Sequence, residues 1–343
     1  MENNCTKYDK KAQNASLTRE NGAFNFVAGT EGLELNVDSA VRTISDYLEN
    51  SWTSDNTEVL NLETQVTEPE GSAEELANIK DLLGSFTTSF STSGSNRCKN
   101  VSSGASHING TVLYPGEEFS AYETVSPFTE ANGYAMAGSY LNGEVVDSMG
   151  GGICQVSTTL YNAVLRAELN VTERSPHSMT VHYVDLSEDA AIAGTYKDFK
   201  FVNSTEYPIY IEGYTTSDKK ITFNIYGKET RDKNRTISFE SQMVSETPAT
   251  TILQEDAGQG IGYKAVSSKG SSGYVAELYK IVKVNGVETD RIKVNKSTYK
   301  GTNRVVTYGT AGDPTLSENL RAAIAAQDEA LADANIAAAV PAQ

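Results

Sequence analysis

One cysteine stands in a setting that suits a nucleophile. Cys154 follows the glycine run 150–152 and precedes a segment with helical periodicity. Apolar residues recur there at the spacing of one helix face: Val156, Leu160, Ala163, Val164 and Ala167. We expect Cys154 at a helix N-terminus, where free N–H groups and the helix dipole favour a negative charge and lower the pKa of a thiol. The alternative is a small buried side chain in a turn.

A histidine and two aspartates follow in the chain order of papain-like and NlpC-type thiol enzymes. Residues 175–184 predict a strand that Pro176 opens, with His177 at its start. Further strands are expected around Asp189 and Asp198. In such a site the histidine takes the thiol proton and one of the aspartates orients the imidazole. The sequence leaves open which aspartate does so.

The elements that would hold these groups predict a mixed fold. Residues 207–212 and 220–226 are strand-like and are separated by a polar turn, and the second segment alternates apolar and polar residues. We expect an α+β fold with a central antiparallel sheet, on which the helix that starts at Cys154 packs. A small α/β domain precedes it and an all-β module follows it.

The region around the cysteine resembles the VanW family, which is named for a gene found beside glycopeptide-resistance genes in Gram-positive bacteria. The resemblance covers about residues 96–228, and six segments carry it: 109–120, 133–137, 150–158, 176–178, 189–190 and 198–201. It implies a protein in the cell wall or anchored on the outer face of the membrane of a Gram-positive bacterium, with peptidoglycan or another wall glycan as partner. It implies no settled biochemical activity.

Several residues are candidates for substrate binding. Arg97 and Asn100 match an arginine and an asparagine of the family, and a guanidinium binds carboxylates bidentately. A surface salt bridge is the alternative for Arg97. The backbone N–H of Cys154, with a donor such as Gln155, would hold an oxyanion. The remaining candidates surround the thiol: Gly151, Gly152, Ser157 and Thr158.

Composition excludes several classes of function. The 28 basic and 45 acidic residues give a net charge of −17, which argues against nucleic acid. No apolar run is long enough to span a membrane, and we expect that the anchor usual in the family has been removed. Zinc-ligand spacings and a phosphate-loop ending are missing, so we expect no metal and no cofactor, with a metal site of Cys154, His177 and an aspartate as the alternative. Of the three cysteines, Cys5 and Cys98 could pair and leave Cys154 free.

Beyond the VanW-like domain, which we place at 86–228, the chain divides into four further parts. Residues 1–85 resemble part of a peptidoglycan-binding domain, with a packing appendage as the alternative. Residues 229–245 are charged and are expected to be a linker. Residues 246–310 contain a hairpin with an Asn-Gly turn and resemble the G-five module, which implies adhesion to wall glycans, with a rigid spacer as the alternative. Residues 311–343 form an acidic, alanine-rich tail that need not pack.

Two functions from different classes fit these patterns. On the sequence alone we favour a non-catalytic protein of wall binding or assembly, in the class of accessory proteins of vancomycin resistance. The alternative is a Cys–His thiol enzyme of the amidase, endopeptidase or transpeptidase type that acts on peptidoglycan peptides. A thiol that alkylates fast near pH 7 would distinguish the enzyme from the binding protein.

Overall fold

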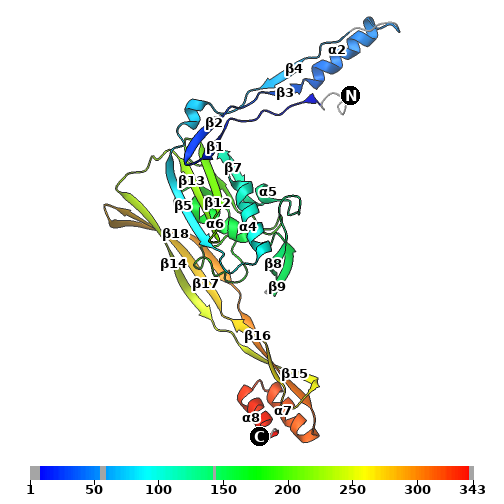
Figure 1. Ribbon diagram of the computed structural model, residues 1–343, viewed down its shortest axis with the longest axis vertical. Helices are drawn as coiled ribbons and strands as arrows, with labels where there is room; N and C mark the ends of the chain where they lie inside the picture. The colour runs from blue at the N-terminus through cyan, green and yellow to red at the C-terminus, as the bar shows by residue number, and fades with distance from the viewer. Residues whose placement is uncertain (1–7, 55–58, 142–143, 340–343) are drawn as a thin grey trace.

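A computed structural model describes residues 8–54, 59–141 and 144–339 and shows an elongated molecule (Figure 1). A narrow N-terminal arm leads into a central α+β domain, long strands run along that domain, and two helices end the chain. The mixed α+β class and the all-β character of the region after the central domain are confirmed. Within the described residues no helix is long and apolar enough to cross a membrane.

The N-terminal arm consists of short two-stranded units. Its elements are β1 (Ser16–Glu20) with β2 (Ala23–Val27), β3 (Gly32–Leu35) with β4 (Thr64–Thr67), α2 (Val37–Asn50) and α3 (Ala73–Leu76). Asn36 caps α2, because its side chain accepts a hydrogen bond from the Ser39 N–H. Leu17 and Leu76 pack against Tyr114 of the central domain. Cys5 lies outside the described residues, and so does its expected pairing with Cys98, which is a free thiol.

The central sheet has four antiparallel strands in the order β5-β13-β12-β6. Their bounds are Asp81–Ser89, Lys220–Gly227, Ile209–Thr215 and Thr111–Leu113. Helices α4 (Ser95–Ile108) and α6 (Ile153–Arg166) contact this sheet and each other. Helix α6 lies directly on the backbone of β5, since a Cβ added at Gly84 would come 2.4 Å from the Ala163 carbonyl oxygen. The glycine therefore sets how closely the cysteine helix approaches the sheet.

A smaller sheet and a hairpin complete the central domain. The smaller sheet has the order β10-β11-β7, with bounds Asn170–Glu173, Lys200–Val202 and Glu118–Ser120. Strands β8 (Met136–Leu141) and β9 (Glu144–Met149) form the hairpin, and α5 (Ala121–Val125) is a short helix. The strand expected over 175–184 is wrong. Residues 174–192, all of them described, form an irregular loop between β10 and β11, because no strand pairs along it and side chains bind several of its backbone groups, such as the His177 N–H and the Ala190 carbonyl.

Two three-stranded sheets form the region that follows. The first is β14-β17-β18, with bounds Arg235–Thr247, Gly273–Val284 and Val287–Tyr299. The second is β15-β19-β16, with bounds Thr251–Gly260, Thr302–Ala311 and Lys264–Ser271. Asn285 and Gly286 join β17 to β18 with φ values of 52° and 80°, as a type I′ turn requires. The linker expected over 229–245 differs from the structure, in which β14 begins at Arg235 and pairs with β17 over its whole length.

The alanine-rich tail is also more ordered than expected. Residues 314–339 form α7 (Pro314–Ala325) and α8 (Glu329–Ala339). Leu320, Ala323 and Ala332 are buried against Leu253 and Tyr308 of the second sheet. Because alanine is small, the two helices lie close together, and the ion pairs Arg304–Glu329 and Lys264–Asp333 attach α8 to the strands.

Candidate functional site

A glycine turn places Cys154 at the start of α6. Gly152 is the N-cap residue with φ 105°, and Cys154 is the second residue of the helix. A Cβ at Gly151 would come 2.3 Å from the Ala137 carbonyl oxygen, so only glycine fits there. Cys154 is half-buried, and its thiol donates to the Ile192 carbonyl at 3.3 Å.

His177 lies between this thiol and a buried carboxylate. Oδ2 of Asp189 accepts hydrogen bonds from the backbone N–H and from Nδ1 of His177, both at 2.7 Å. The side chain of His177 also lies close enough to Cys154 that each group shifts the pKa of the other. Asp189 is fully buried, and its Oδ1 accepts from Arg174 at 3.0 Å and from the Tyr299 hydroxyl at 2.5 Å. The structure therefore brings Cys154, His177 and Asp189 into one row, in which His177 is hydrogen-bonded to Asp189 and lies beside Cys154.

The charges of this row favour a thiolate beside an imidazolium. Burial raises the pKa of the Cys154 thiol, but the hydrogen bond and charge of His177 outweigh burial and lower it. Burial lowers the pKa of His177, whereas its bonds to Asp189 and Cys154 raise it to about 9. Burial likewise opposes ionisation of Asp189, yet His177 and Arg174 hold its pKa below the ordinary value. An ionised thiol of this kind is a strong nucleophile near neutral pH.

Three of the expected substrate-binding residues are buried and hold the site together. Ser157 and Thr158 donate to the Ala190 carbonyl at 2.7 and 3.2 Å, which fixes the loop of Asp189 against α6. Asn100 is completely buried, donates to the Gly151 and Ala135 carbonyls at 2.9 Å each and accepts from the Ala135 N–H. These side chains shape the glycine turn and the loop, and they present no polar atom to a bound molecule.

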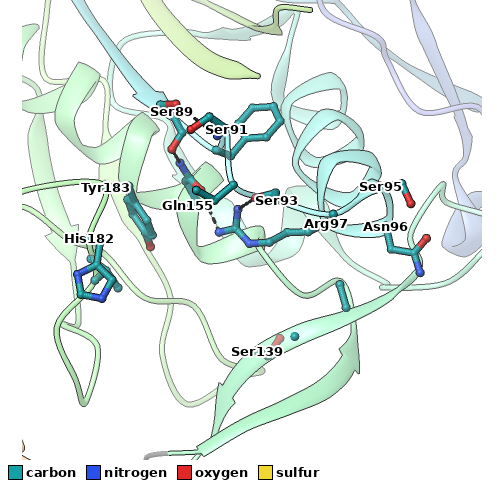
Figure 2. A pocket seen from close by; sticks show the side chains of 16 residues that line it. Ser89, Ser91, Ser93, Ser95, Asn96, Arg97, Ser139, Gln155, His182 and Tyr183 are labelled. Carbon is teal, nitrogen blue, oxygen red and sulfur yellow. Dashed lines mark hydrogen bonds between the residues drawn. The ribbon is translucent and has the colours of Figure 1, made fainter. Parts of the chain in front are cut away.

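A pocket of about 920 Å³ (Figure 2) is lined by Gln155, the residue after Cys154, but not by the three residues of the row. Residues 89–97 form one wall, and His182 and Tyr183 face it. Arg97 donates to Ser93 at 2.7 Å and to Oε1 of Gln155 at 2.9 Å. The Gln155 amide nitrogen donates to Thr88 and Ser89. Since both amide protons of Gln155 are used, its side chain is a poor oxyanion donor, and it serves instead to hold Arg97 in the wall of the pocket.

Asp198 lies in a different place from the other acidic candidate. Its carboxylate accepts hydrogen bonds from the Ser120 hydroxyl at 2.5 Å and from the backbone N–H groups of Tyr122 and Phe199. These contacts fix the start of α5, so Asp189 and not Asp198 orients His177. A grouping of acidic, histidine and cysteine side chains suited to a metal ion is not found among the described residues.

Three further residues belong to the site and were not expected from the sequence. One is Tyr183, whose pKa is raised well above 10 by burial together with the nearby Cys154. Arg174 and Tyr299 bind the carboxylate of Asp189. An arginine before the Pro-His step was a usable signal for Arg174. Tyr299 comes from β18, more than a hundred positions away, and no local pattern marks it.

Comparisons with known proteins agree with this division of the chain. Residues 96–226 match the family described as VanW like protein, and residues 240–311 match the G5 domain. The chain contains a VanW-like domain followed by a G5 domain. Neither match includes residues 1–85, so the peptidoglycan-binding domain expected there is not shown.

Two curated relatives resemble the VanW-like part. The uncharacterized protein YoaR of Bacillus subtilis is 40% identical over 144 residues, which are 42% of this chain and 48% of the relative. The vancomycin B-type resistance protein VanW of Enterococcus faecalis is 29% identical over 138 residues, which are 38% of this chain and 49% of the relative. The chain thus spans about half the length of each. A solved G5 domain of an IgA1 protease aligns over 24% of this chain and 100% of its own at 24% identity, with a TM-score of 0.19.

Proposed function

We propose that the protein is a cell-wall-associated thiol acyltransferase, with Cys154, His177 and Asp189 as its catalytic triad and peptidoglycan peptides as its substrates. The observation that carries the proposal is the position of His177, which hydrogen-bonds a fully buried carboxylate and lies beside the thiol whose pKa it lowers. Nucleophile, base and orienting acid in this order form the arrangement of acyl transfer.

The reaction proceeds through a thioester. The Cys154 thiolate attacks the carbonyl carbon of a peptide bond and forms a C–S bond, while His177 carries the proton. When the C–N bond breaks, the imidazolium gives this proton to the leaving amine. Water or a second amine then attacks the thioester, His177 takes the proton of that nucleophile, and the thiolate leaves. Water gives hydrolysis of the wall peptide, and an amine gives a new peptide cross-link.

Two donors are available for the oxyanion of this reaction. The N–H groups in the first turn of a helix have no acceptor within the helix, and Cys154 belongs to that turn of α6. Tyr183 keeps its proton because its pKa is raised well above 10, and its side chain lines the pocket beside the thiol. Both groups suit a negative charge that develops next to Cys154.

The proposed location in the cell wall rests on the two domains that the chain contains. A VanW-like domain and a G5 domain occur together, and one relative is named for vancomycin resistance. In the pocket, Arg97 contributes a cation that would pair with a carboxylate of a wall peptide. Compared with the binding function favoured on the sequence alone, the triad geometry favours the enzyme.

The test uses peptidoglycan fragments and mass spectrometry. The full chain is expected to change the fragment masses, and Cys154→Ala is expected to abolish the change while it leaves the circular dichroism spectrum and melting temperature close to those of the wild type. Cys98→Ala removes the other free thiol of the described residues and should leave the products unchanged. Identical fragment profiles for wild type and Cys154→Ala would overturn the enzyme and favour a wall-binding protein.

A further inference from the structure

One face of strand β18 in the G5 domain lies against the loop that carries His177 and Asp189. Alternate residues of a strand share a face, and Asn295, Ser297 and Tyr299 all contact the central domain. Ser297 is 1% and Tyr299 2% exposed, whereas Lys296 and Thr298 between them face solvent. The G5 domain therefore contacts both this loop and α6.

Tyr299 binds the carboxylate of the triad and the main chain next to it. Its hydroxyl donates to Oδ1 of Asp189 at 2.5 Å and accepts from the backbone N–H of Ser187 at 2.7 Å. The other oxygen of Asp189 is the one that holds His177. With Oδ1 held by the phenol, the carboxylate cannot rotate without losing a bond, so Oδ2 stays directed at the imidazole.

Ser297 acts on the same carboxylate through Arg174. The guanidinium donates to the Ser297 hydroxyl at 2.9 Å, to Oδ1 of Asp189 at 3.0 Å and to the Asp189 carbonyl at 2.6 Å. Backbone contacts extend the attachment, because the Lys300 N–H donates to the Ser178 carbonyl at 2.7 Å. Both ends of the segment between His177 and Asp189 are thus bound by β18 or by the residue that follows it.

We propose that the G5 domain is a structural part of the thiol site and that Tyr299 is a positioning residue for the Asp189–His177 pair. This inference rests on the proposed function, since it assigns Tyr299 a role in the activation of Cys154. The G5 domain matches its own family model and would be taken for a separate module. Here it supplies two side chains, Tyr299 and Ser297, that hold the catalytic carboxylate of the neighbouring domain in place.

The experiment measures how fast iodoacetamide alkylates Cys154 in the full chain between pH 5 and 9. Tyr299→Phe removes the hydroxyl and keeps the ring, so the fold should persist. We expect alkylation at pH 6 to slow about tenfold, the size of effect that loss of one hydrogen bond to a charged group produces, and the pH midpoint to move upward. Tyr274→Phe is the matched control, because Tyr274 pairs with Tyr299 across the sheet and its hydroxyl bonds the exposed Glu246.

A double-mutant cycle separates positioning from general destabilisation. In an Asp189→Asn background, Tyr299→Phe should have no further effect on the alkylation profile, whereas a merely structural change would slow both backgrounds equally. Ser297→Ala is a second variant and should shift the profile in the same direction by a smaller factor. An unchanged profile in Tyr299→Phe, or equal slowing in both backgrounds, would overturn the inference.

The alkylation readout needs no wall substrate, so it is distinct from the test of the proposed function. If wall fragments stay intact but Tyr299→Phe shifts the profile, the proposed function fails and the positioning role stands. If Cys154 turns over wall fragments while the profile of Tyr299→Phe equals that of the wild type, the enzyme stands and the inference about the G5 domain fails.

Discussion

A single oxygen of Asp189 binds His177 twice, at the backbone nitrogen and at Nδ1, with both distances 2.7 Å. The two bonds fix the ring relative to its own main chain, and the carboxylate occupies Nδ1. The remaining ring nitrogen, Nε2, is then the one available to Cys154. This relationship explains how an irregular loop, and not a strand, holds the ring of His177 in one orientation.

The first prediction concerns the thiol. The pKa of Cys154 is lowered from its ordinary value, so its thiolate persists at a pH where an ordinary thiol is protonated. We expect iodoacetamide to label Cys154 well before Cys98 at pH 6. His177→Ala removes the imidazolium and should raise the thiol pKa and slow the labelling. Peptide mass spectrometry after timed quenching measures both rates. Labelling of Cys154 only after denaturation would contradict the prediction.

The second prediction concerns the upper pH limit of activity. The pKa of His177 is raised to about 9, so the imidazolium is present below that pH and is lost as pH rises through it. Transfer of a proton to the leaving amine should therefore decline above pH 9, although the thiolate remains. Turnover of wall fragments measured from pH 6 to 10 should fall on the alkaline side, while iodoacetamide labelling of Cys154 should not. A parallel fall of both rates would count against this assignment of the proton.

The third prediction concerns Asn100. Asn100→Ala leaves the Gly151 carbonyl and the Ala135 backbone without their buried partner, which should cost about 1–3 kcal/mol per lost group. Asn96→Ala is the control on the same helix, since its one bond, to the Met136 carbonyl, is exposed. Urea unfolding should show a clear loss for the first variant and little for the second. Equal midpoints for the two variants would argue against the scaffold role.

The fourth prediction concerns the attachment of the G5 domain by Glu168. Burial opposes its ionisation, but Arg235 and Lys280 lower its pKa from 4.5 to about 2. A lowered pKa gives stability that is fully present above pH 4.5 and is lost as pH falls toward 2, on the order of 3 kcal/mol in total. Glu168→Gln should therefore lower the melting temperature at pH 7, and its difference from the wild type should shrink as pH falls below 4.5. Glu240→Gln, at an exposed ion pair with Arg291, should change little at either pH.

Local sequence patterns predicted the structure correctly where it depends on residues within a single helix or strand. The glycine run and the apolar spacing after Cys154 marked a helix start, and the alternation in 220–226 marked a central strand. The strand expected at 175–184 was wrong because the Asp189 carboxylate, and not a neighbouring strand, accepts the hydrogen bond of the His177 N–H. The two residues are twelve positions apart, so no local sequence pattern marks this contact. The segment at 235–245 is a strand whose first half alternates in burial, with Glu240 on the exposed face and Arg235 on the partly buried face, where it pairs with Glu168.

The contacts between domains were beyond such patterns. Asn295, Ser297 and Tyr299 look like ordinary residues of an exposed hairpin until the loop is placed against them. The same holds for Leu278 of β17, which joins the core cluster of the central domain. Local patterns pointed to Cys154 and His177, which the structure brings together, while Tyr299 and Ser297 come from a strand more than a hundred positions away.

The alternating contacts of β18 limit how this protein can be recombined. A G5 domain grafted from another chain would have to present Asn, Ser and Tyr at every second position, in the same register, to meet the loop. A graft without them, or one that slips by a single residue, would place solvent-facing side chains such as those of Lys296 and Thr298 against Arg174 and Asp189. Exchange of domains by simple fusion would then leave the buried Arg174–Asp189 pair without Ser297 and Tyr299. Substitutions in one domain therefore have to be matched by substitutions in the other.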